Sequence, residues 1–269
     1  MEVFSTSRND IKKFSLNKNF IQKQALHKQE LSLPIDLVNK LKVNPEYRGP
    51  EIDVVYEDTM LLVLNKPPGI HCHPLRYDEH DNCLSFLRMG RGNRILKVNE
   101  MNYDRGLLYR LDYGTSGLLF YIKDPFLHKK MRERFSLVVK EKYYLAIVKG
   151  QFVDVGTHKC LMEPFGKKGE QMRIAKAGGF PAHMEAELID YNDYEDVSLV
   201  KVRIFTGVRH QVRFQLADLE FPILGDELYG GETARRMYLH CFHYVVEHGG
   251  EIWNVQIPPG DLFKQYFNY

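Results

Sequence analysis

A charged turn between apolar segments is the sequence feature that most constrains how this chain can fold. Residues 118–122 (LLFYI) form an uninterrupted apolar run, which is typical of a strand buried on both faces. Residues 106–108 (GLL), before the turn, suggest the end of a second apolar strand. The turn carries Asp112, with Arg110 two residues before it. Because charged groups beside a core cost free energy unless they are paired, this turn is the first candidate for a functional site.

Asp112 also has a purely structural interpretation. Aspartate is common in tight turns, where its side chain hydrogen-bonds the neighbouring backbone. Arg110 fits, in the same way, the salt-bridge partner of a nearby acidic residue. On spacing alone the turn role is the more common one, so the functional interpretation depends on other parts of the chain.

Short β-type runs dominate the chain beyond residue 50, and helical patterns are few. A hairpin is expected at residues 53–56 and 61–64, where a polar turn joins two such runs. Further strands are expected at residues 140–149, 183–191, 197–206, 238–246 and 251–257. Helices are expected at residues 82–91, 126–138 and 210–219, and a mobile loop at residues 164–179. Because strands and helices do not alternate as in βαβ units, the pattern indicates an α+β fold with a largely antiparallel sheet.

The composition is that of a globular protein, with 44% hydrophobic and 27% charged residues. No apolar run approaches the roughly 20 residues that span a bilayer, and the first residues lack the pattern of a secretory signal. We therefore expect a cytoplasmic protein without membrane contact. The net charge is only +2, so a nucleic-acid surface has to come from local clusters. Candidates, each of which also fits a solvated surface, are Lys129, Lys130, Arg132 and Arg134 on a helix and Lys167 and Lys168 in a loop.

The cysteines are scattered and form no Cys-x-x-Cys pair. They are Cys72, Cys83, Cys160 and Cys241. Cys72 lies between His71 and His73, which raises the question of a metal site. Neighbouring residues of a strand point to opposite faces, and no second cluster completes a set of four ligands. We therefore predict no metal site, and reduced thiols that pack as small apolar groups.

Four motifs, in the same order along the chain, resemble those of the RluA-type pseudouridine synthases. The first is LVLNKPPG at residues 62–69, and the second is RLDYGTSGLL at residues 110–119. The third is KYYLAIVKG at residues 142–150. The fourth begins with GVRHQVR at residues 207–213 and continues with PILGD and LYG at residues 222–230. The resemblance extends from about residue 53 to about residue 262, and four motifs in order are far more specific than any one of them.

The resemblance implies a mixed central sheet with flanking helices and an active cleft across its middle. It makes Asp112 the catalytic carboxylate, as nucleophile or as electrostatic stabiliser. It implies that Arg213 pairs with Asp112 and keeps it charged, and that Tyr144 stacks on the target base. Arg110 is the candidate to fill the stack that a flipped-out uridine leaves. No cofactor and no metal are implied.

Structural alternatives remain open for these residues. Arg213 also fits a structural ion pair on a helix, and Tyr144 fits a core tyrosine. Tyr143 is the better candidate for the core, because neighbouring residues of a strand point to opposite faces. Two departures from the family pattern concern target recognition more than catalysis. Tyr109 stands where the family commonly has His, and Arg209 lies one residue away from the usual arginine of the fourth motif.

The sequence thus predicts an RNA pseudouridine synthase that isomerises specific uridines in structured RNA, either ribosomal or transfer RNA. Residues 51–269 are expected to form the catalytic domain, and residues 1–50 a basic N-terminal extension without a clear S4-type RNA-binding pattern. The protein is expected to be a monomer. The alternatives are a non-catalytic RNA-binding protein of the same fold and a hydrolase that uses Asp112 on free uridine. The sequence does not indicate which uridine is modified.

Overall fold

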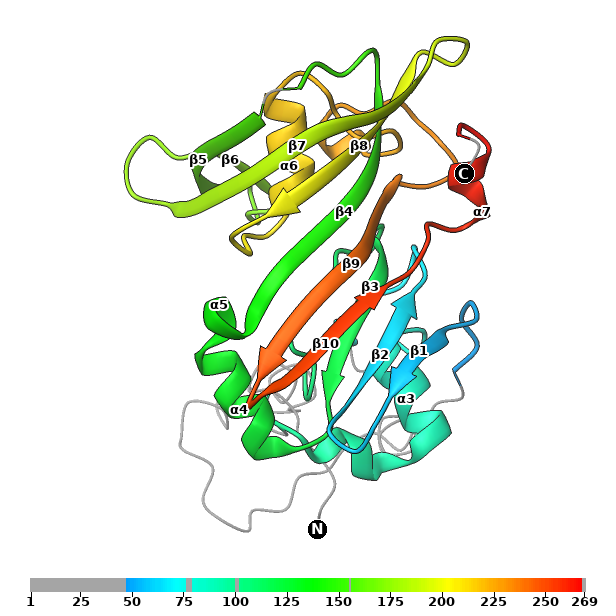
Figure 1. The fold of residues 1–269 in the computed structure, drawn as a ribbon, viewed down its shortest axis with the longest axis vertical. Coiled ribbons are helices and arrows are strands. Elements are labelled where there is room, and N and C mark those ends of the chain that lie inside the picture. The colour runs from blue at the N-terminus through cyan, green and yellow to red at the C-terminus, as the bar shows by residue number, and fades with distance from the viewer. Residues whose placement is uncertain (1–46, 76–78, 100–101, 155, 268–269) are drawn as a thin grey trace, which may run out of the picture.

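The computed structural model describes residues 47–75, 79–99, 102–154 and 156–267. Their strands are β1 (Asp53–Glu57), β2 (Leu61–Lys66), β3 (Ser116–Ile122), β4 (Val139–Lys149), β5 (Gly156–Phe165), β6 (Gln171–Ile174), β7 (Phe180–Asn192), β8 (Val197–Ile204), β9 (Leu239–His248) and β10 (Glu251–Gln256). They form one ten-stranded sheet that runs the length of the molecule (Figure 1). The sheet order is β1-β2-β3-β9-β4-β8-β7-β5-β6, and β10 pairs with β9 beside this path.

The pairing of the strands gives the sheet a mixed character. β3 and β9 are parallel, with Ser116 opposite His240 and Gly117 opposite Cys241. Every other pair of named strands in the described part of the chain is antiparallel. The predicted α+β fold, with a mixed, largely antiparallel central sheet and flanking helices, is therefore confirmed.

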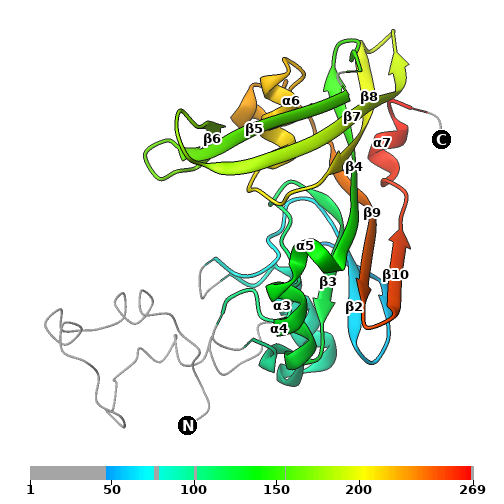
Figure 2. The ribbon, with the colours of Figure 1, turned by 60° about the vertical axis from the view of Figure 1, so that its left-hand side comes forward.

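The helices cover both sides of the sheet. They are α3 (Cys83–Arg91), η2 (Asn93–Lys97), α4 (Pro125–Glu133), α5 (Phe135–Val138), α6 (Gln211–Asp218), η3 (Glu227–Tyr229) and α7 (Asp261–Lys264). Figure 2 shows α3, α4 and α5 together on one face of the lower half of the sheet, with α6 above them beside β7. α7 lies on the opposite side, where Phe263 packs with Tyr238 and with Leu145 and Ile147 of β4. Each face of β4 therefore belongs to a different hydrophobic cluster.

The largest hydrophobic cluster forms where β2 and β3 pack against the helices. All residues of β3 are buried, and so are the apolar residues of β2. Leu87 of α3 and Met131 of α4 are fully buried in the same cluster. Burial of each large apolar side chain contributes roughly 1.5–3 kcal/mol. β3 is therefore a firmly held support for the charged turn that precedes it.

The helix predicted at residues 126–138 is interrupted. α4 begins at Pro125, as expected, and Asp124 caps it by accepting a hydrogen bond from the backbone N–H of Leu127 at 2.7 Å. At Arg134 the backbone leaves the helical region, with φ −117° and ψ 31°, and α5 is a separate turn beyond it. Phe126 is 79% exposed and does not join the predicted apolar face. Apolar spacing continues across the break because α4 and α5 pack on the same face of the sheet, where α5 contacts β4.

Two other local predictions were wrong. Residues 106–108 form turns and a single bridge between Leu107 and Tyr121 rather than the end of a strand. Part of the predicted loop at residues 164–179 is β6, which pairs with the end of β5. The composition of this segment is that of a loop because glycines and lysines are concentrated in its turns. The other expected strands and helices lie close to their predicted bounds.

β3 can approach β9 only because residue 117 is glycine. The φ angle of Gly117 is +113°, and a Cβ atom at this position would lie 2.2 Å from the carbonyl oxygen of Cys241. β9 in turn pairs with β4 along most of its length. The start of β3, and with it the charged turn, is thereby fixed beside the middle of the sheet.

The predicted N-terminal extension lies almost entirely outside the described residues, which begin at Tyr47. From there the chain leads into β1, and the ring of Tyr47 packs edge-on against Phe86 of α3, with 5.5 Å between centroids. In the described part of the chain, no helix is both long and apolar enough to cross a membrane.

Candidate active site

A buried lysine anchors the backbone directly after Asp112. Lys66, the last residue of β2, is fully buried. Its ammonium group donates hydrogen bonds to the carbonyl oxygens of Pro67 at 2.9 Å, Ile70 at 2.8 Å and Tyr113 at 3.2 Å. The backbone N–H of Gly69 donates to the same Tyr113 oxygen at 2.9 Å. Two donors, from the end of β2 and from the turn after it, therefore fix the carbonyl of Tyr113, one residue beyond Asp112.

The backbone before Asp112 is fixed as well. The thiol of Cys72 lies 3.2 Å from both the backbone nitrogen and the carbonyl oxygen of Leu111, so it accepts from the first and donates to the second. Burial raises the pKa of Cys72, which keeps the thiol protonated as that donor requires. The carbonyl of Asp112 itself accepts from the backbone N–H of Thr115 at 3.2 Å, which closes the turn. The carboxylate is thus presented from a rigid loop.

Arg213 of α6 joins two carboxylates. Its Nη1 donates to Oδ2 of Asp112 at 3.1 Å, while its Nε and Nη2 donate to the two oxygens of Asp226 at 2.7 and 2.8 Å. The side chain of Asp226 is 2% exposed, and that of Asp112 is 26% exposed. Burial alone would lower the pKa of Arg213, but the hydrogen bonds to Asp226 and the charge of Asp112 raise it. The expected Arg213–Asp112 pair is present, and Asp226 orients the guanidinium for it.

His210, just before α6, also faces the carboxylate of Asp112. The hydroxyl of Tyr229 accepts a hydrogen bond from the backbone N–H of Met172 at 2.9 Å and lies 2.9 Å from Nδ1 of His210. Nε2 of His210 lies 3.9 Å from Oδ1 of Asp112. Burial lowers the pKa of His210, although the charge of Asp112 opposes this. The imidazole of His210 therefore lies between the hydroxyl of Tyr229 and the carboxylate of Asp112.

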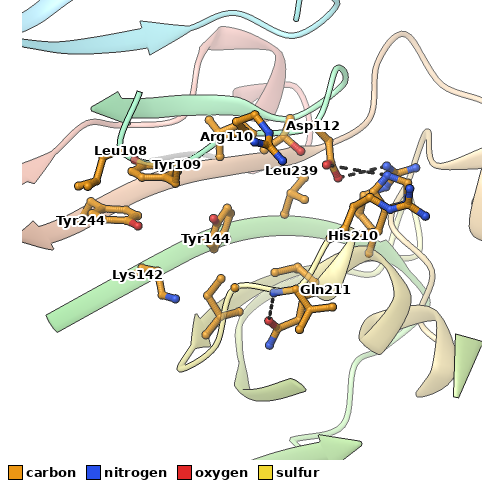
Figure 3. A pocket seen from close by; sticks show the side chains of 18 of the residues that line it. Leu108, Tyr109, Arg110, Asp112, Lys142, Tyr144, His210, Gln211, Leu239 and Tyr244 are labelled. Atoms are coloured by element: carbon orange, nitrogen blue, oxygen red, sulfur yellow. Dashed lines mark hydrogen bonds and ion pairs between the residues drawn. The ribbon is translucent and has the colours of Figure 1, made fainter. Parts of the chain in front are cut away.

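A cavity of about 430 Å³ opens in front of Asp112 (Figure 3). Residues 108–112 and Arg132 line one side, residues 207–213 line the other, and Tyr144 of β4 lies between them. Apolar side chains also contribute to the lining, and they include Leu111, Ile204, Val208, Val212 and Leu239. Polar and charged side chains line the cavity to a similar extent, and this combination suits a small planar ligand held in one orientation.

Tyr144 projects from β4 into this cavity (Figure 3). Burial raises the pKa of Tyr144 well above its usual value, so its hydroxyl stays protonated at neutral pH. Tyr143 faces the other side of the sheet, where its ring stacks on His243 with 5.4 Å between centroids. The expectation that Tyr143 is the better core residue was wrong, because Tyr144 is buried and Tyr143 is only partly buried. Tyr144 is buried in the sheet and also lines the cavity, so the two interpretations of this residue do not exclude each other.

Arg110 lies at the edge of the cavity with a side chain that is 55% exposed. Its Nη1 is 3.4 Å from Oδ2 of Asp104, and Nη2 of Arg132 is 3.3 Å from the same oxygen. The salt bridge with a nearby acidic residue, which was the structural alternative for Arg110, is therefore present, and its partner is Asp104. The guanidinium of Arg110 is exposed whereas the side chain of Asp104 is only 8% exposed, and Asp104 keeps Arg132 when Arg110 leaves. Arg110 is thus free to exchange this contact for another one.

Lys142, two residues before Tyr144 on β4, adds a cation to the cavity. It is 6% exposed, its ammonium donates to the carbonyl oxygen of Thr206, and it lies 5.6 Å from the ring centroid of Phe135. Burial lowers the pKa of Lys142 to about 8. Lys142 is therefore still charged at neutral pH, and it favours a ligand that carries oxygen acceptors.

The two departures from the family pattern have structural roles. The hydroxyl of Tyr109 donates to the carbonyl of Leu118 at 2.7 Å, and its ring stacks on Tyr244 with 4.4 Å between centroids. Nη2 of Arg209 donates to the carbonyl oxygens of Gly169 and Gln171, the second at 3.1 Å. Arg209 therefore holds the lysine-rich turn between β5 and β6 at the cavity, and Tyr109 packs into its wall.

The structure brings Asp112, Tyr144, Arg213 and Arg110 to one cavity. Sequence reasoning did not single out Asp226, His210 or Lys66 as parts of the site. All of them lie within the recognised motifs, but spacing does not reveal which motif residues converge in space. Among the described residues, no group of three His, Cys, Asp or Glu side chains is placed to hold a metal ion.

Comparison with known proteins decides the family of this chain. The sequence model of the family described as RNA pseudouridylate synthase matches residues 60–218. This chain belongs to the RNA pseudouridylate synthase family. The matched range contains Asp112, Tyr144 and Arg213, and Asp226 lies just beyond it. The resemblance to RluA-type enzymes that the motifs carried is confirmed.

Characterised and uncharacterised RNA pseudouridine synthases resemble the chain over most of its length. It is 33% identical over 181 residues to a ribosomal large subunit pseudouridine synthase D of Borreliella burgdorferi, a match that covers 66% of this chain and 55% of the relative. It is 30% identical over 204 residues to an uncharacterized RNA pseudouridine synthase of Bacillus subtilis, covering 74% and 64%. The matched part is therefore less than two thirds of either relative.

A solved structure supports the fold of this RNA pseudouridylate synthase family member. Human RNA Pseudouridylate Synthase Domain Containing 1 superposes with a TM-score of 0.63 at 23% identity, over 78% of this chain and 84% of the human chain. A second human protein, RNA Pseudouridylate Synthase Domain Containing 4, gives a TM-score of 0.60 at 20% identity. Both likenesses concern the arrangement of the sheet and helices.

Proposed function

We propose that this protein isomerises specific uridines in structured RNA to pseudouridine, with Asp112 as the catalytic residue. The observation that carries the proposal is the carboxylate of Asp112 at a cavity lined by both apolar and charged side chains, paired with a guanidinium that Asp226 holds in place. A charged group that is already oriented needs no reorganisation when charge develops in the substrate. Membership of the family supports the reaction class.

The reaction exchanges one bond of the nucleoside for another. The N1–C1′ bond of uridine breaks, a C5–C1′ bond forms, C5 loses its proton and N1 gains one, so the product is an isomer. Asp112 acts as a nucleophile or stabilises the positive charge that develops on the ribose. Arg213 keeps the carboxylate of Asp112 in its position throughout. The apolar walls retain the detached uracil while it turns to present C5.

Tyr144 and its neighbours hold the base. The ring of Tyr144 offers a face on which uracil stacks, and such stacking on an aromatic ring contributes about 1–3 kcal/mol per base. The neutral hydroxyl of Tyr144 and the charged ammonium of Lys142 are hydrogen-bond donors near the uracil oxygens. Neither group is displaced when uracil turns, because both belong to β4.

A uridine inside an RNA helix reaches Asp112 only after it leaves the stack, which costs a few kcal/mol. Arg110, at the mouth of the cavity, is the residue that occupies the vacated space. Its planar guanidinium stacks on bases and contacts phosphates. The weak contact with Asp104 is what Arg110 gives up in this movement.

Large-subunit ribosomal RNA is the substrate that the relatives favour, since several of them are named ribosomal large subunit pseudouridine synthase D. The test is to map pseudouridine in ribosomal and transfer RNA from cells with the gene, without it, and without it but supplied with wild-type protein or Asp112→Asn. We expect at least one ribosomal position to lose pseudouridine and to regain it only with the wild-type protein. Loss at a transfer RNA position would correct the substrate, and an unchanged map would contradict the proposed activity.

The alternatives predict different outcomes. A non-catalytic RNA-binding protein of the same fold predicts that Asp112→Asn restores whatever the deletion changes. A hydrolase acting on free uridine predicts that the purified protein releases uracil from uridine. Two exposed clusters favour a polymer over a nucleoside: the basic residues of α4, and the lysine-rich turn that Arg209 holds at the cavity.

A further inference from the structure

A second hollow lies on the far side of the Asp112 loop. It has a volume of about 840 Å³ and is lined by residues 68, 69, 71–73, 75, 110–114, 225–228 and 235–237, together with Arg209, His210 and Arg213. We call it the flanking groove. It shares Arg110, Asp112 and Arg213 with the cavity in front of Tyr144. The two hollows are therefore adjacent, on the two sides of the Asp112 loop.

The flanking groove carries an exposed aromatic side chain beside the catalytic loop. This side chain is that of Tyr113, and the residue is 54% exposed. Its backbone is nevertheless fixed, because its carbonyl oxygen accepts hydrogen bonds from Gly69 and from the buried Lys66. Tyr113 is therefore a large apolar surface on a rigid support, in contact with water.

His71 supports the ring of Tyr113 from behind. The two ring centroids are 4.8 Å apart and the planes are inclined by 49°. Burial lowers the pKa of His71, so its imidazole is neutral at neutral pH and packs as an uncharged ring. With His71 on one side, the remaining face of Tyr113 stays available to a ligand.

The charges around the flanking groove suit an anionic chain. Arg110 and Arg235 line it and are exposed. Among the acidic residues that line it, Asp226 is engaged with Arg213, Asp112 shares the same guanidinium, and Glu227 is exposed. Phosphate groups on either side of a nucleotide can thus meet the exposed guanidinium groups of Arg110 and Arg235, while the nucleotide itself meets an aromatic face.

We infer that Tyr113, backed by His71, is a stacking platform for the base of a nucleotide next to the target uridine. Tyr113 follows Asp112 directly in the chain, and the flanking groove and the cavity share Arg110, Asp112 and Arg213, so the base on Tyr113 is assigned to an immediate neighbour of the target nucleotide. Single-stranded RNA is commonly recognised through such splayed bases on aromatic rings. The inference rests on the proposed function, since it requires RNA in the cavity, but it concerns binding rather than the reaction.

The test combines a protein variant with a substrate variant. Wild-type protein, Tyr113→Ala and Tyr113→Phe are titrated by fluorescence anisotropy against the labelled heptamer AAAUAAA. The same titration uses two heptamers in which the nucleotide 5′ or 3′ of the uridine lacks its base. Tyr194→Ala removes another tyrosine, 91% exposed, from the turn between β7 and β8 and serves as the matched control.

We expect Tyr113→Ala to weaken binding of the complete heptamer by about 5- to 150-fold, the range that corresponds to one stacked base. The loss should shrink to within twofold on one of the two abasic heptamers, and Tyr113→Phe and Tyr194→Ala should resemble the wild type. Unchanged affinity of Tyr113→Ala, or an equal loss on all three heptamers, would overturn the inference. The proposed function is decided separately by the pseudouridine map of cellular RNA, so an unchanged map together with these binding results would contradict the proposed function and retain the stacking platform.

Discussion

Individual residues of the site are held in place before any substrate arrives. Arg213 directs two nitrogens to Asp226 and only one to Asp112, so its orientation does not depend on the carboxylate that reacts. Asp226 is almost fully buried, and a buried carboxylate is tolerable only because this guanidinium pairs with it. The sequence showed a possible Asp112–Arg213 pair, whereas the more buried half of the network became visible only in three dimensions.

Replacement of Asp226 by Asn tests this network. Asp226→Asn keeps the shape but removes the charge opposite a buried guanidinium, which should lower the free energy of unfolding by about 3 kcal/mol. Turnover should fall as well, because Arg213 is no longer oriented towards Asp112. Urea denaturation and single-turnover kinetics measure the two effects, with Asp261→Asn, at a 92% exposed side chain, as the neutral control. Equal stability of both variants would show that Asp226 does not hold Arg213.

Arg110 should matter only when a base has to be extruded. In a folded stem-loop the enzyme offsets a few kcal/mol of unstacking, whereas a flexible strand has less stacking to lose. Arg110→Ala should therefore slow turnover much more on a stem-loop than on a single strand of the same local sequence. The single-strand rate reports whether Asp112 is still correctly placed. Equal losses on the two RNAs would mean that Arg110 acts on Asp112 or on folding.

At the scale of elements, the position of the Asp112 loop depends on how closely two strands meet. β3 runs parallel to β9 for only two residue pairs, and the contact requires glycine at position 117. The turn after β2 then holds the loop from the other side through Lys66 and Cys72. The loop is therefore set by three segments that are distant in sequence.

Gly117→Ala tests the approach of β3 to β9. An alanine would place its Cβ against the Cys241 carbonyl at a φ angle that it rarely adopts, so we expect a loss of at least about 2 kcal/mol in the free energy of unfolding. Gly90→Ala is the matched control, because Gly90 lies within α3 with no atom within 4 Å of the added Cβ. It should be neutral or more stable by about 0.5 kcal/mol. Chemical denaturation that shows the same effect for both would refute the packing argument.

The sequence predicted elements well where one physical pattern dominates. The apolar run at residues 118–122 and the alternation in the later strands mark buried strands, and Pro125 marks a helix start. The sequence did not predict the helix break at Arg134, because apolar spacing continues across it. It did not predict β6 either, because the glycines and lysines around this short strand are typical of a loop. Convergence of Asp226 and His210 on Asp112 also escaped prediction, since spacing along a chain contains no information about distances between motifs.

For the whole molecule, the site lies where the two halves of the sheet meet. β4 runs through both halves (Figure 1), since its first part pairs with β9 and its later part with β8. The walls of the cavity come from the Asp112 loop on one side and from α6 and the end of β8 on the other. Basic side chains are exposed on α4 and on the turn between β5 and β6, on the two sides of this junction. An RNA that enters the cavity passes between them.

The salt dependence of RNA binding measures whether these charges meet phosphates. Each phosphate that a cation neutralises adds about 0.7–0.9 to the slope of log affinity against log salt concentration. Lys130→Gln combined with Lys168→Gln should therefore reduce the slope by about 1–2. Lys264→Gln combined with Lys149→Gln provides the control, because it removes two lysines outside α4 and the turn between β5 and β6, one in α7 and one at the end of β4. An unchanged slope in the first pair would mean that its charges are only solvated.

The central claim is that Asp112 performs the chemistry and contributes little to binding. Asp112→Asn keeps the size and most hydrogen bonds of the side chain but removes its charge and nucleophile. The decisive measurement is single-turnover formation of pseudouridine by this variant, alongside its dissociation constant for the same RNA. The account predicts a rate lower by several orders of magnitude, with a dissociation constant within a few fold of the wild type. A near-normal rate would contradict it.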